Sequence, residues 1–387
     1  MKKSLTALAV LVASGASFAE ATITGQIQMG YQALHTVSGG ATGTPFSGPA
    51  PYLGIYNGSS RTVDTSGLGV DTANIYFTVS EDLGGGQTLV AKQGFDTVRR
   101  GSVAGGDTVM TYTNNSFGQI ELGSVKDSDV FSGVAYGSDN LITFDGRLNQ
   151  IETSSDYISY AAPIGPFLFK FIHSESSNGL GLGTGTQGAA PITTQGNNTF
   201  ILAYLKGPLT TFGAYRSYNN QDEAGGVFNG NGLTKKSVIH VEAGYDFGRA
   251  KVGLGVDHVD ANWGFTQDSV MVGVSVPVGA WLFSGAFESV KANSSNLPIG
   301  AVGSGPATLP VPSFWQAVMA QTDGTANGIS LAAQYNLSKR SNVAVKYSSW
   351  MRSGYAQFEA FGITQNPNEF GYKDRSSDLR VELTTNF

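Results

Sequence analysis

The 387-residue sequence contains no cysteine, and this absence removes several kinds of chemistry at once. Without Cys there is no structural disulfide, no thiolate nucleophile and no cysteine-ligated metal site. The four histidines, His35, His173, His240 and His258, are scattered and lack a His-x-x-x-His spacing, so they do not form a zinc motif. We therefore expect no metal and no cofactor.

Charge and long apolar runs are also scarce. Only 13% of residues are charged, with 29 acidic against 23 basic side chains, and no basic stripe is present, which argues against nucleic-acid binding. Beyond the N-terminal segment nothing approaches the run of 18 or more apolar residues that a membrane helix needs, which excludes a helical membrane protein. What is abundant is 52 Gly, 22 Phe and 16 Tyr, material of strands and turns. The composition predicts an all-β chain.

The N-terminus predicts a secretory signal peptide over residues 1–19. Lys2 and Lys3 precede a short apolar region at 5–13, and residues 17–19 form a small-x-small cleavage site, with 19–21 as a second option. Cleavage removes both lysines and leaves 21 basic against 29 acidic residues, a net charge near −8. No Pro- or Ser-rich linker or charge run divides the remainder, so residues 20–387 are expected to form one domain.

The C-terminal segment 376–387 carries most of its apolar side chains on one phase and its charged side chains on the other. Leu379, Val381, Leu383 and Phe387 share one phase, while Asp378, Arg380 and Glu382 share the other. Because a strand turns successive side chains to opposite faces, this segment has one apolar face and one charged face. Residues 269–278 alternate in the same way, with valine at every second position. Such patterning behind a secretory signal predicts a transmembrane antiparallel β-barrel.

The rhythm of connections predicts about sixteen strands of roughly 7 to 13 residues, near the length that crosses a bilayer at a tilt. Tight turns are expected at 81–86, 115–118, 162–166, 206–208, 246–248, 276–279 and 338–341. Long segments alternate with them at 33–67, 96–106, 127–153, 177–196, 220–233, 292–325 and 354–375, with a shorter one near Asn262. This asymmetry is typical of outer-membrane barrels, with turns in the periplasm and loops outside. About sixteen strands also leave an aqueous lumen, which eight would not.

Several segments resemble the general trimeric porins of Gram-negative bacteria, particularly the β-proteobacterial and neisserial branch. The similar segments are 80–86, 117–123 and 335–341, together with the terminal Phe387, and the resemblance covers nearly all of the mature chain. The family's usual Arg-Gln-Ala-type strand start is replaced by residues 99–101, and the first and seventh loops are long. The resemblance implies a homotrimer in outer-membrane lipid, each chain enclosing its own pore. Phe387 is similar to the family's signal for the barrel assembly machinery.

By strand count, the third long segment corresponds to the loop that folds into the lumen in such porins. Its charged residues are mostly acidic: Asp127, Asp129, Asp139, Asp145, Arg147 and Glu152. Acids on this loop facing bases on the wall would create a transverse field that orients polar solutes. The candidate wall bases are Lys92, Arg99, Arg100, Lys170, Arg216, Lys346 and Arg380. The alternative is that these are ordinary solvated charges.

The sequence therefore predicts an outer-membrane porin for passive diffusion of small hydrophilic solutes, with a weak preference for cations because acids are in excess. It predicts no catalytic residue and no enzyme activity. Three alternatives stay open: a substrate-selective channel, a plugged surface barrel acting as an adhesin or structural protein, and an outer-membrane hydrolase. The hydrolase alternative rests on His258 and Asp260, which share a strand face.

Overall fold

The computed structural model describes residues 19–38, 61–96, 103–125, 131–137, 141, 148, 155–176, 196–218, 235–261, 266–293, 324–354 and 373–387. These residues form sixteen strands and one short helix, α2 (Gly133–Tyr136). The strands are β1 (Glu20–Ser38), β2 (Arg61–Gly84), β3 (Gln87–Asp96), β4 (Ala104–Asn114), β5 (Gly118–Val125), β6 (Ser155–Ile164), β7 (Phe167–Ser176), β8 (Gly196–Lys206), β9 (Leu209–Tyr218), β10 (Lys235–Asp246), β11 (Lys251–Ala261), β12 (Thr266–Val278), β13 (Trp281–Asn293), β14 (Gly324–Asn336), β15 (Ser341–Gly354) and β16 (Lys373–Asn386).

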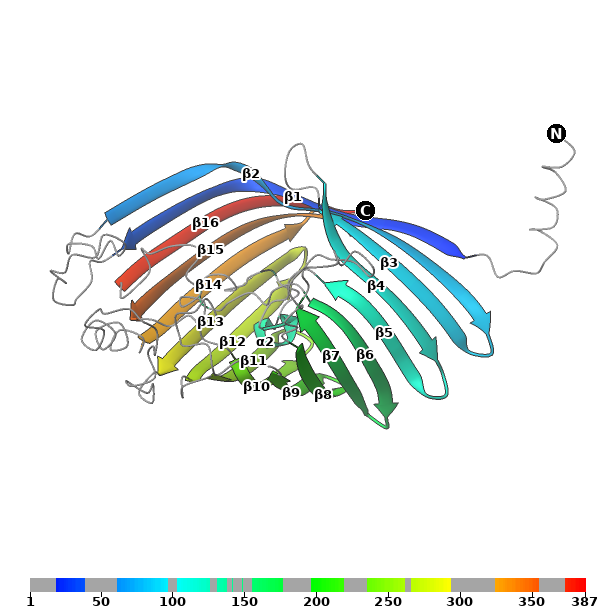
Figure 1. Cartoon of the computed structure of the whole chain (residues 1–387). Helices are drawn as coiled ribbons and strands as arrows, with labels where there is room; N and C mark the ends of the chain where they lie inside the picture. The colour runs from blue at the N-terminus through cyan, green and yellow to red at the C-terminus, as the bar shows by residue number, and fades with distance from the viewer. Residues whose placement is uncertain are drawn as a thin grey trace, which may run out of the picture.

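The strands follow one another in chain order around a closed antiparallel barrel (Figure 1). The predicted all-β fold and the predicted number of strands are therefore confirmed. Closure leaves no sheet edge, which is the condition for placing strands in hydrocarbon, where an unpaired backbone group finds no water. Within the described residues, no helix is both long and apolar enough to cross a membrane.

The seven predicted tight turns all join neighbouring strands. Positive-φ glycines occupy many of them, for example Gly165 (φ 62°), Gly207 (φ 74°) and Gly279 (φ 61°), because a left-handed backbone is least costly without a Cβ. The predicted long segments coincide with the other connections, whose residues mostly lie outside the described part of the chain.

The first predicted long segment, 33–67, is wrong at both ends. β1 continues to Ser38 and β2 already begins at Arg61, so the first hairpin is longer than expected. The two strands stay paired over this extension, where His35 lies opposite Asp64 and their side chains come within 2.5 Å. Cross-strand pairing of this kind supports strand structure that the mixed local sequence did not indicate.

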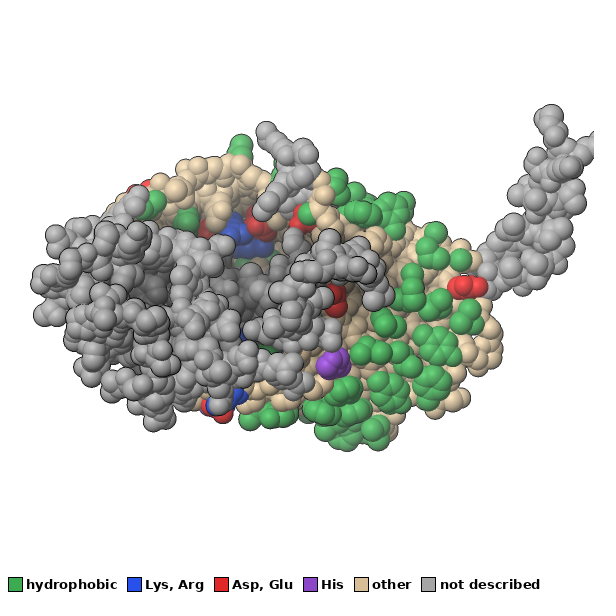
Figure 2. All heavy atoms as spheres, viewed as in Figure 1, with side chains coloured by type: hydrophobic (Ala, Val, Ile, Leu, Met, Phe, Trp, Pro, Cys, Tyr) green, Lys and Arg blue, Asp and Glu red, His purple; other side chains and the backbone are tan. Residues whose placement is uncertain are grey.

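Burial alternates along the strands as the sequence predicts. On β12, Met271, Gly273 and Ser275 are buried, whereas the intervening Val272 and Val274 are about two-fifths exposed. The exposed phase is apolar on strand after strand, and Figure 2 shows these side chains gathered over one outer face of the barrel. The outer surface thus suits lipid, and the polar phase faces the interior.

Aromatic residues mark the end of the barrel that carries the tight turns. Trp281 stacks on Phe283 and contacts Tyr335, and Tyr245 contacts Phe247, all with exposed rings. A girdle here agrees with the expected position of the periplasmic interface.

The C-terminal residue takes part in closing the barrel between β1 and β16. Gly25 and Phe387 exchange two backbone hydrogen bonds of 3.0 Å. The ring of Phe387 lies so close to Gly25 that a Cβ there would be 2.5 Å from its Cζ. Gly25 therefore provides the space in which the terminal aromatic ring lies.

Candidate pore constriction and lumen wall

The third long connection contributes the only non-strand element of the described residues, α2, with its flanks Phe131, Ser132 and Gly137. Ser132 caps the helix, its hydroxyl accepting from the Val134 amide, and Gly137 ends it in the left-handed region at φ 64°. Phe131, Ala135 and Tyr136 are fully buried, although they belong to no strand of the barrel. We refer to residues 131–137 as the docked segment.

The docked segment lies against the inner face of β10, β11 and β12 (Figure 1). This face is identified by burial, because Gly253 and Gly255 are covered while Val252, Leu254 and Val256 on the opposite phase are exposed. At least this part of the third long connection therefore contacts the lumen side of the barrel.

Three glycines make the close approach possible, and we call Gly253, Gly255 and Gly273 the glycine seat. A Cβ on Gly253 would lie 2.6 Å from the carbonyl carbon of Ala135, and one on Gly255 would lie 2.9 Å from the Ala135 Cβ. A Cβ on Gly273 would collide with the backbone of Tyr136. The helix thus rests directly on the main chain of the wall, and any side chain at these positions would lift it.

Glu242 on β10 fastens the docked segment to the seat. Its carboxylate accepts from the Ser132 amide (2.8 Å), the Ser132 hydroxyl (2.6 Å) and the Ala135 amide (2.9 Å). Bonds to a buried carboxylate are charge-assisted and stronger than neutral ones. Ser275 adds a hydrogen bond to the carbonyl of Gly137 at the other end of the helix.

His240, two residues before Glu242 on the same face, connects this anchor to β11. Its Nε2 lies 2.9 Å from Glu242 and its Nδ1 lies 3.1 Å from Asp257. Carboxylates only accept, so both contacts are hydrogen bonds when both ring nitrogens carry hydrogen. The rings of Phe131 and Phe212 both lie near the imidazole of His240, with centroids 5.4 Å and 5.6 Å from it.

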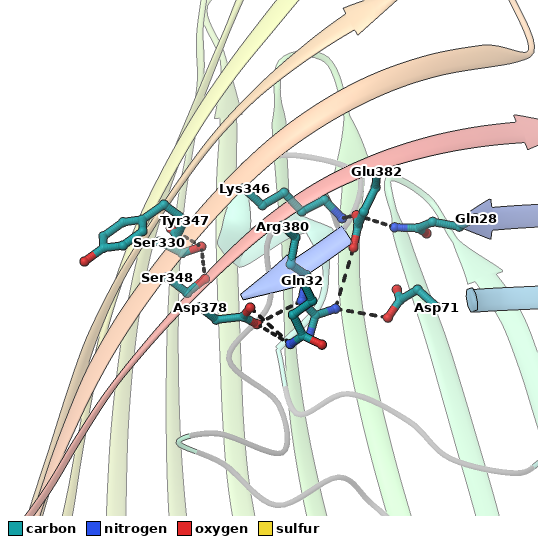
Figure 3. A network of polar contacts seen from close by, with 10 residues as sticks. All are labelled: Gln28, Gln32, Asp71, Ser330, Lys346, Tyr347, Ser348, Asp378, Arg380 and Glu382. Atoms are coloured by element: carbon teal, nitrogen blue, oxygen red, sulfur yellow. Dashed lines mark hydrogen bonds and ion pairs between the residues drawn. The ribbon is translucent and has the colours of Figure 1, made fainter. Parts of the chain in front are cut away.

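A second polar cluster lies where β1, β2, β15 and β16 meet, and we call it the wall network (Figure 3). Arg380 donates through Nε to Asp378 (2.8 Å) and through Nη1 to Asp71 (3.0 Å), and Lys346 lies 2.7 Å from Glu382. Figure 3 shows these side chains pointing toward one another, together with two glutamines. Gln28 donates to Glu382 and Gln32 donates to Asp378.

The remaining described bases of the predicted set also lie on the inner face. Lys170 is 3.3 Å from Glu121, which further accepts from the hydroxyl of Tyr157. Lys92 lies over the ring of Tyr76, with Nζ 4.0 Å from its centroid. Arg216 donates to the hydroxyl of Thr199 at 3.0 Å. Lys170, Lys346 and Arg380 therefore meet carboxylates of the wall itself, a pairing the sequence did not indicate.

Eight charged residues of the predicted constriction lie outside the described residues. They are Asp127, Asp129, Asp139, Asp145, Arg147, Glu152, Arg99 and Arg100. Their roles stay predictions.

The sequence reasoning missed Asp71, His240, Glu242 and the glycine seat. Alternating glycines on the inward phase of β11 were the available signal for the seat, because such positions let another backbone approach closely. His258, expected beside Asp260, instead contacts Asp268 across β11 and β12 at 2.6 Å, with both side chains exposed. No cluster of potential metal ligands occurs among the described residues.

A closed sixteen-strand barrel with an apolar exterior, a polar interior and an inward-docked segment defines a class, the pore-forming proteins of bacterial outer membranes. The family model of the Gram-negative porin matches residues 4–354. The chain belongs to the Gram-negative porin family, and it is a channel of the outer membrane for diffusion of small solutes. No curated protein sequence matches the chain.

Solved structures agree on the fold. The anion-selective porin of Comamonas acidovorans is 16% identical with a TM-score of 0.59, over 95% of this chain and 100% of that one. The outer-membrane channel DcaP of Acinetobacter baumannii is 12% identical with a TM-score of 0.59, over 95% and 97% of the two chains. The trimer form of OmpT, an outer-membrane protein of Vibrio cholerae, is 12% identical with a TM-score of 0.58, over 95% and 99%. At these identities the likeness concerns the fold.

Proposed function

We propose that the third long connection narrows the lumen and that the pore filters solutes by size and charge at that level. The observation that carries this proposal is the docked segment, held on the inner face of β10, β11 and β12 by Glu242 and the glycine seat. A segment fixed there reduces the open cross-section on that side of the barrel. The acids of residues 127–152 then face a wall that carries Lys92, Lys170, Lys346 and Arg380.

Passage is passive, since sieving and electrostatic filtering need neither an energy source nor covalent chemistry. We propose that the chain has no catalytic activity. His240 contacts Glu242, the carboxylate that holds the docked segment. His258 lies on the outer face of the barrel and contacts Asp268 there. Purified protein is expected to turn over neither phospholipid nor peptide, and turnover lost on His258→Ala would contradict this.

We propose a homotrimer as the working form, supported by the trimer form of the similar OmpT barrel. Planar-bilayer recording tests the passive pore and the homotrimer together. Insertion is expected to appear as conductance steps that close in thirds, without saturation by any single solute. Saturable block by one solute would instead indicate a substrate-selective channel, and purified barrels that insert without conductance would indicate a plugged surface protein.

A further inference from the structure

β2 contains a β-bulge inside the barrel wall. Gln28 of β1 pairs with Thr72, and the next residue, Met29, pairs with Val70, so Asp71 is inserted without a partner on β1. A bulge of this kind re-aims a side chain relative to its neighbours and occurs preferentially beside functional sites.

The bulge turns Asp71 into the lumen. In a regular strand Asp71 would share the phase of Ala73, which pairs with outward-facing Ile27. Its carboxylate instead lies 3.0 Å from Nη1 of Arg380, an inward residue of β16 (Figure 3). A charge directed at lipid is unfavourable, so the bulge both avoids that cost and adds an acid to the interior.

Asp71 gives the wall network an excess of negative charge. Among the described residues of the network, Lys346 and Arg380 are matched in number by Asp378 and Glu382, and Asp71 is a third acid. The Asp378 and Glu382 side chains are only 3% and 4% exposed, while that of Asp71 is 44% exposed. Of the three acids, Asp71 is thus the one that water and solutes in the lumen encounter.

Asp71 also borders a pocket of about 260 Å³ between the bulge and β16. Its lining includes Gly30, Gln32, Ser66, Arg380 and Glu382. This space is large enough for a small hydrated ion or an ammonium group. Its lining mixes polar residues with the apolar Leu68 and Val70 and holds two acids, Asp71 and Glu382, against one base, Arg380, so its net charge favours a cation.

We propose that Asp71 is a specificity-determining residue of the channel, which enriches small cations, including ammonium-bearing solutes, along the wall formed by β1, β2 and β16. This inference rests on the proposed charge filter. It assigns selectivity to a wall residue placed by a bulge, in addition to the acids of the third connection. One charge about 5 Å from a permeating ion in water, screened at about 0.1 M salt, changes its local concentration about two- to three-fold.

The test measures the reversal potential of single channels in a KCl gradient around 0.1 M and again around 1 M. We compare the wild type with Asp71→Asn, with Asp71→Glu, and with Asp64→Asn as matched control. Asp64 lies on the same strand, but it pairs with His35 on the phase of Tyr31 and Leu68, away from the lumen. Asp71→Ser removes the charge in a smaller side chain and replaces Asp71→Asn if that variant does not assemble.

The K⁺ to Cl⁻ permeability ratio is expected to fall about four- to nine-fold in Asp71→Asn at the lower salt, because the charge enriches K⁺ and depletes Cl⁻ by the same factor. It should stay near the wild-type value in Asp71→Glu and Asp64→Asn, and the difference should shrink at the higher salt. An Asp71→Asn ratio equal to that of the wild type, or a shift of the same size in Asp64→Asn, would overturn the inference while leaving the channel function intact. A wild-type protein without conductance would overturn the channel function, and the inference with it.

Discussion

Removal of the Glu242 carboxylate tests how the docked segment is held. Glu242→Ala deletes the acceptor of three hydrogen bonds from residues 131–137 and of a fourth from His240. The Ser132 and Ala135 amides would then be left without this partner beneath the helix. The strand ladder around β10 consists of backbone bonds to β9 and β11, so the barrel itself should remain closed.

The expected loss of docking free energy follows from these contacts. Removing one partner of a buried charged pair costs about 3–5 kcal/mol, because the remaining group is left buried without its partner. At about 1.4 kcal/mol per factor of ten, the undocked population rises roughly 10²- to 4 × 10³-fold. Glu242→Gln keeps an acceptor oxygen without the charge, so an intermediate effect is expected.

The assay combines single-channel recording with liposome swelling over a series of sugars of increasing size. Glu242→Ala is expected to show larger or flickering conductance and a higher exclusion limit than the wild type. The matched control is Asp246→Asn on the same strand, where Asp246 is exposed at the turn and its Asn replacement can still accept from the Gly248 amide. If Glu242→Ala retains the wild-type conductance, noise and exclusion limit, the docked segment does not set the width of the pore.

Three further predictions concern substitutions in the barrel strands. Gly253→Val should lift the docked segment from the glycine seat and change conductance in the same assay, whereas Gly213→Val, on β9 and away from the seat, should not. Val272→Lys places a charge on the lipid face in the middle of β12 and should lower folding stability in vesicles by about 2–4 kcal/mol, against about 0–1 kcal/mol for Val278→Lys at the turn end of the same strand. Equal costs would show that Val272 lies no deeper in the membrane than Val278. Gly25→Leu should displace the Phe387 ring and lower the temperature at which the barrel unfolds in detergent; an unchanged temperature would show that this contact adds no stability.

The strands and their faces could be predicted because each is encoded locally. Every second side chain of 270–278 and 376–387 already indicates which face meets lipid, and turn residues mark seven of the connections. The same phase places Lys346 and Arg380 on the inner wall. The alternation and the turn residues can be recognised within a single segment, so the partner strand need not be known.

Several contacts in the wall network could not be predicted, because they join opposite ends of the chain. Arg380 meets Asp71 across 309 positions, and Glu382 meets Gln28 across 354. The bulge turns Asp71 to the inner face, whereas regular alternation would place it on the outer face. The local sequence does not predict a bulge at this position. The docked segment was equally hidden, since its apolar residues find their cover only when the third connection meets β11 and β12.

The glycine seat separates two properties that a channel protein must control. Because α2 rests on bare main chain, its position is fixed by the interstrand ladder and not by the size of neighbouring side chains. Lumen residues such as Lys346 and Asp71 are therefore free to change from one relative to another without moving the helix. Ion selectivity could therefore be changed at a constant pore width by substituting those side chains, provided that Glu242, Gly253, Gly255 and Gly273 are kept.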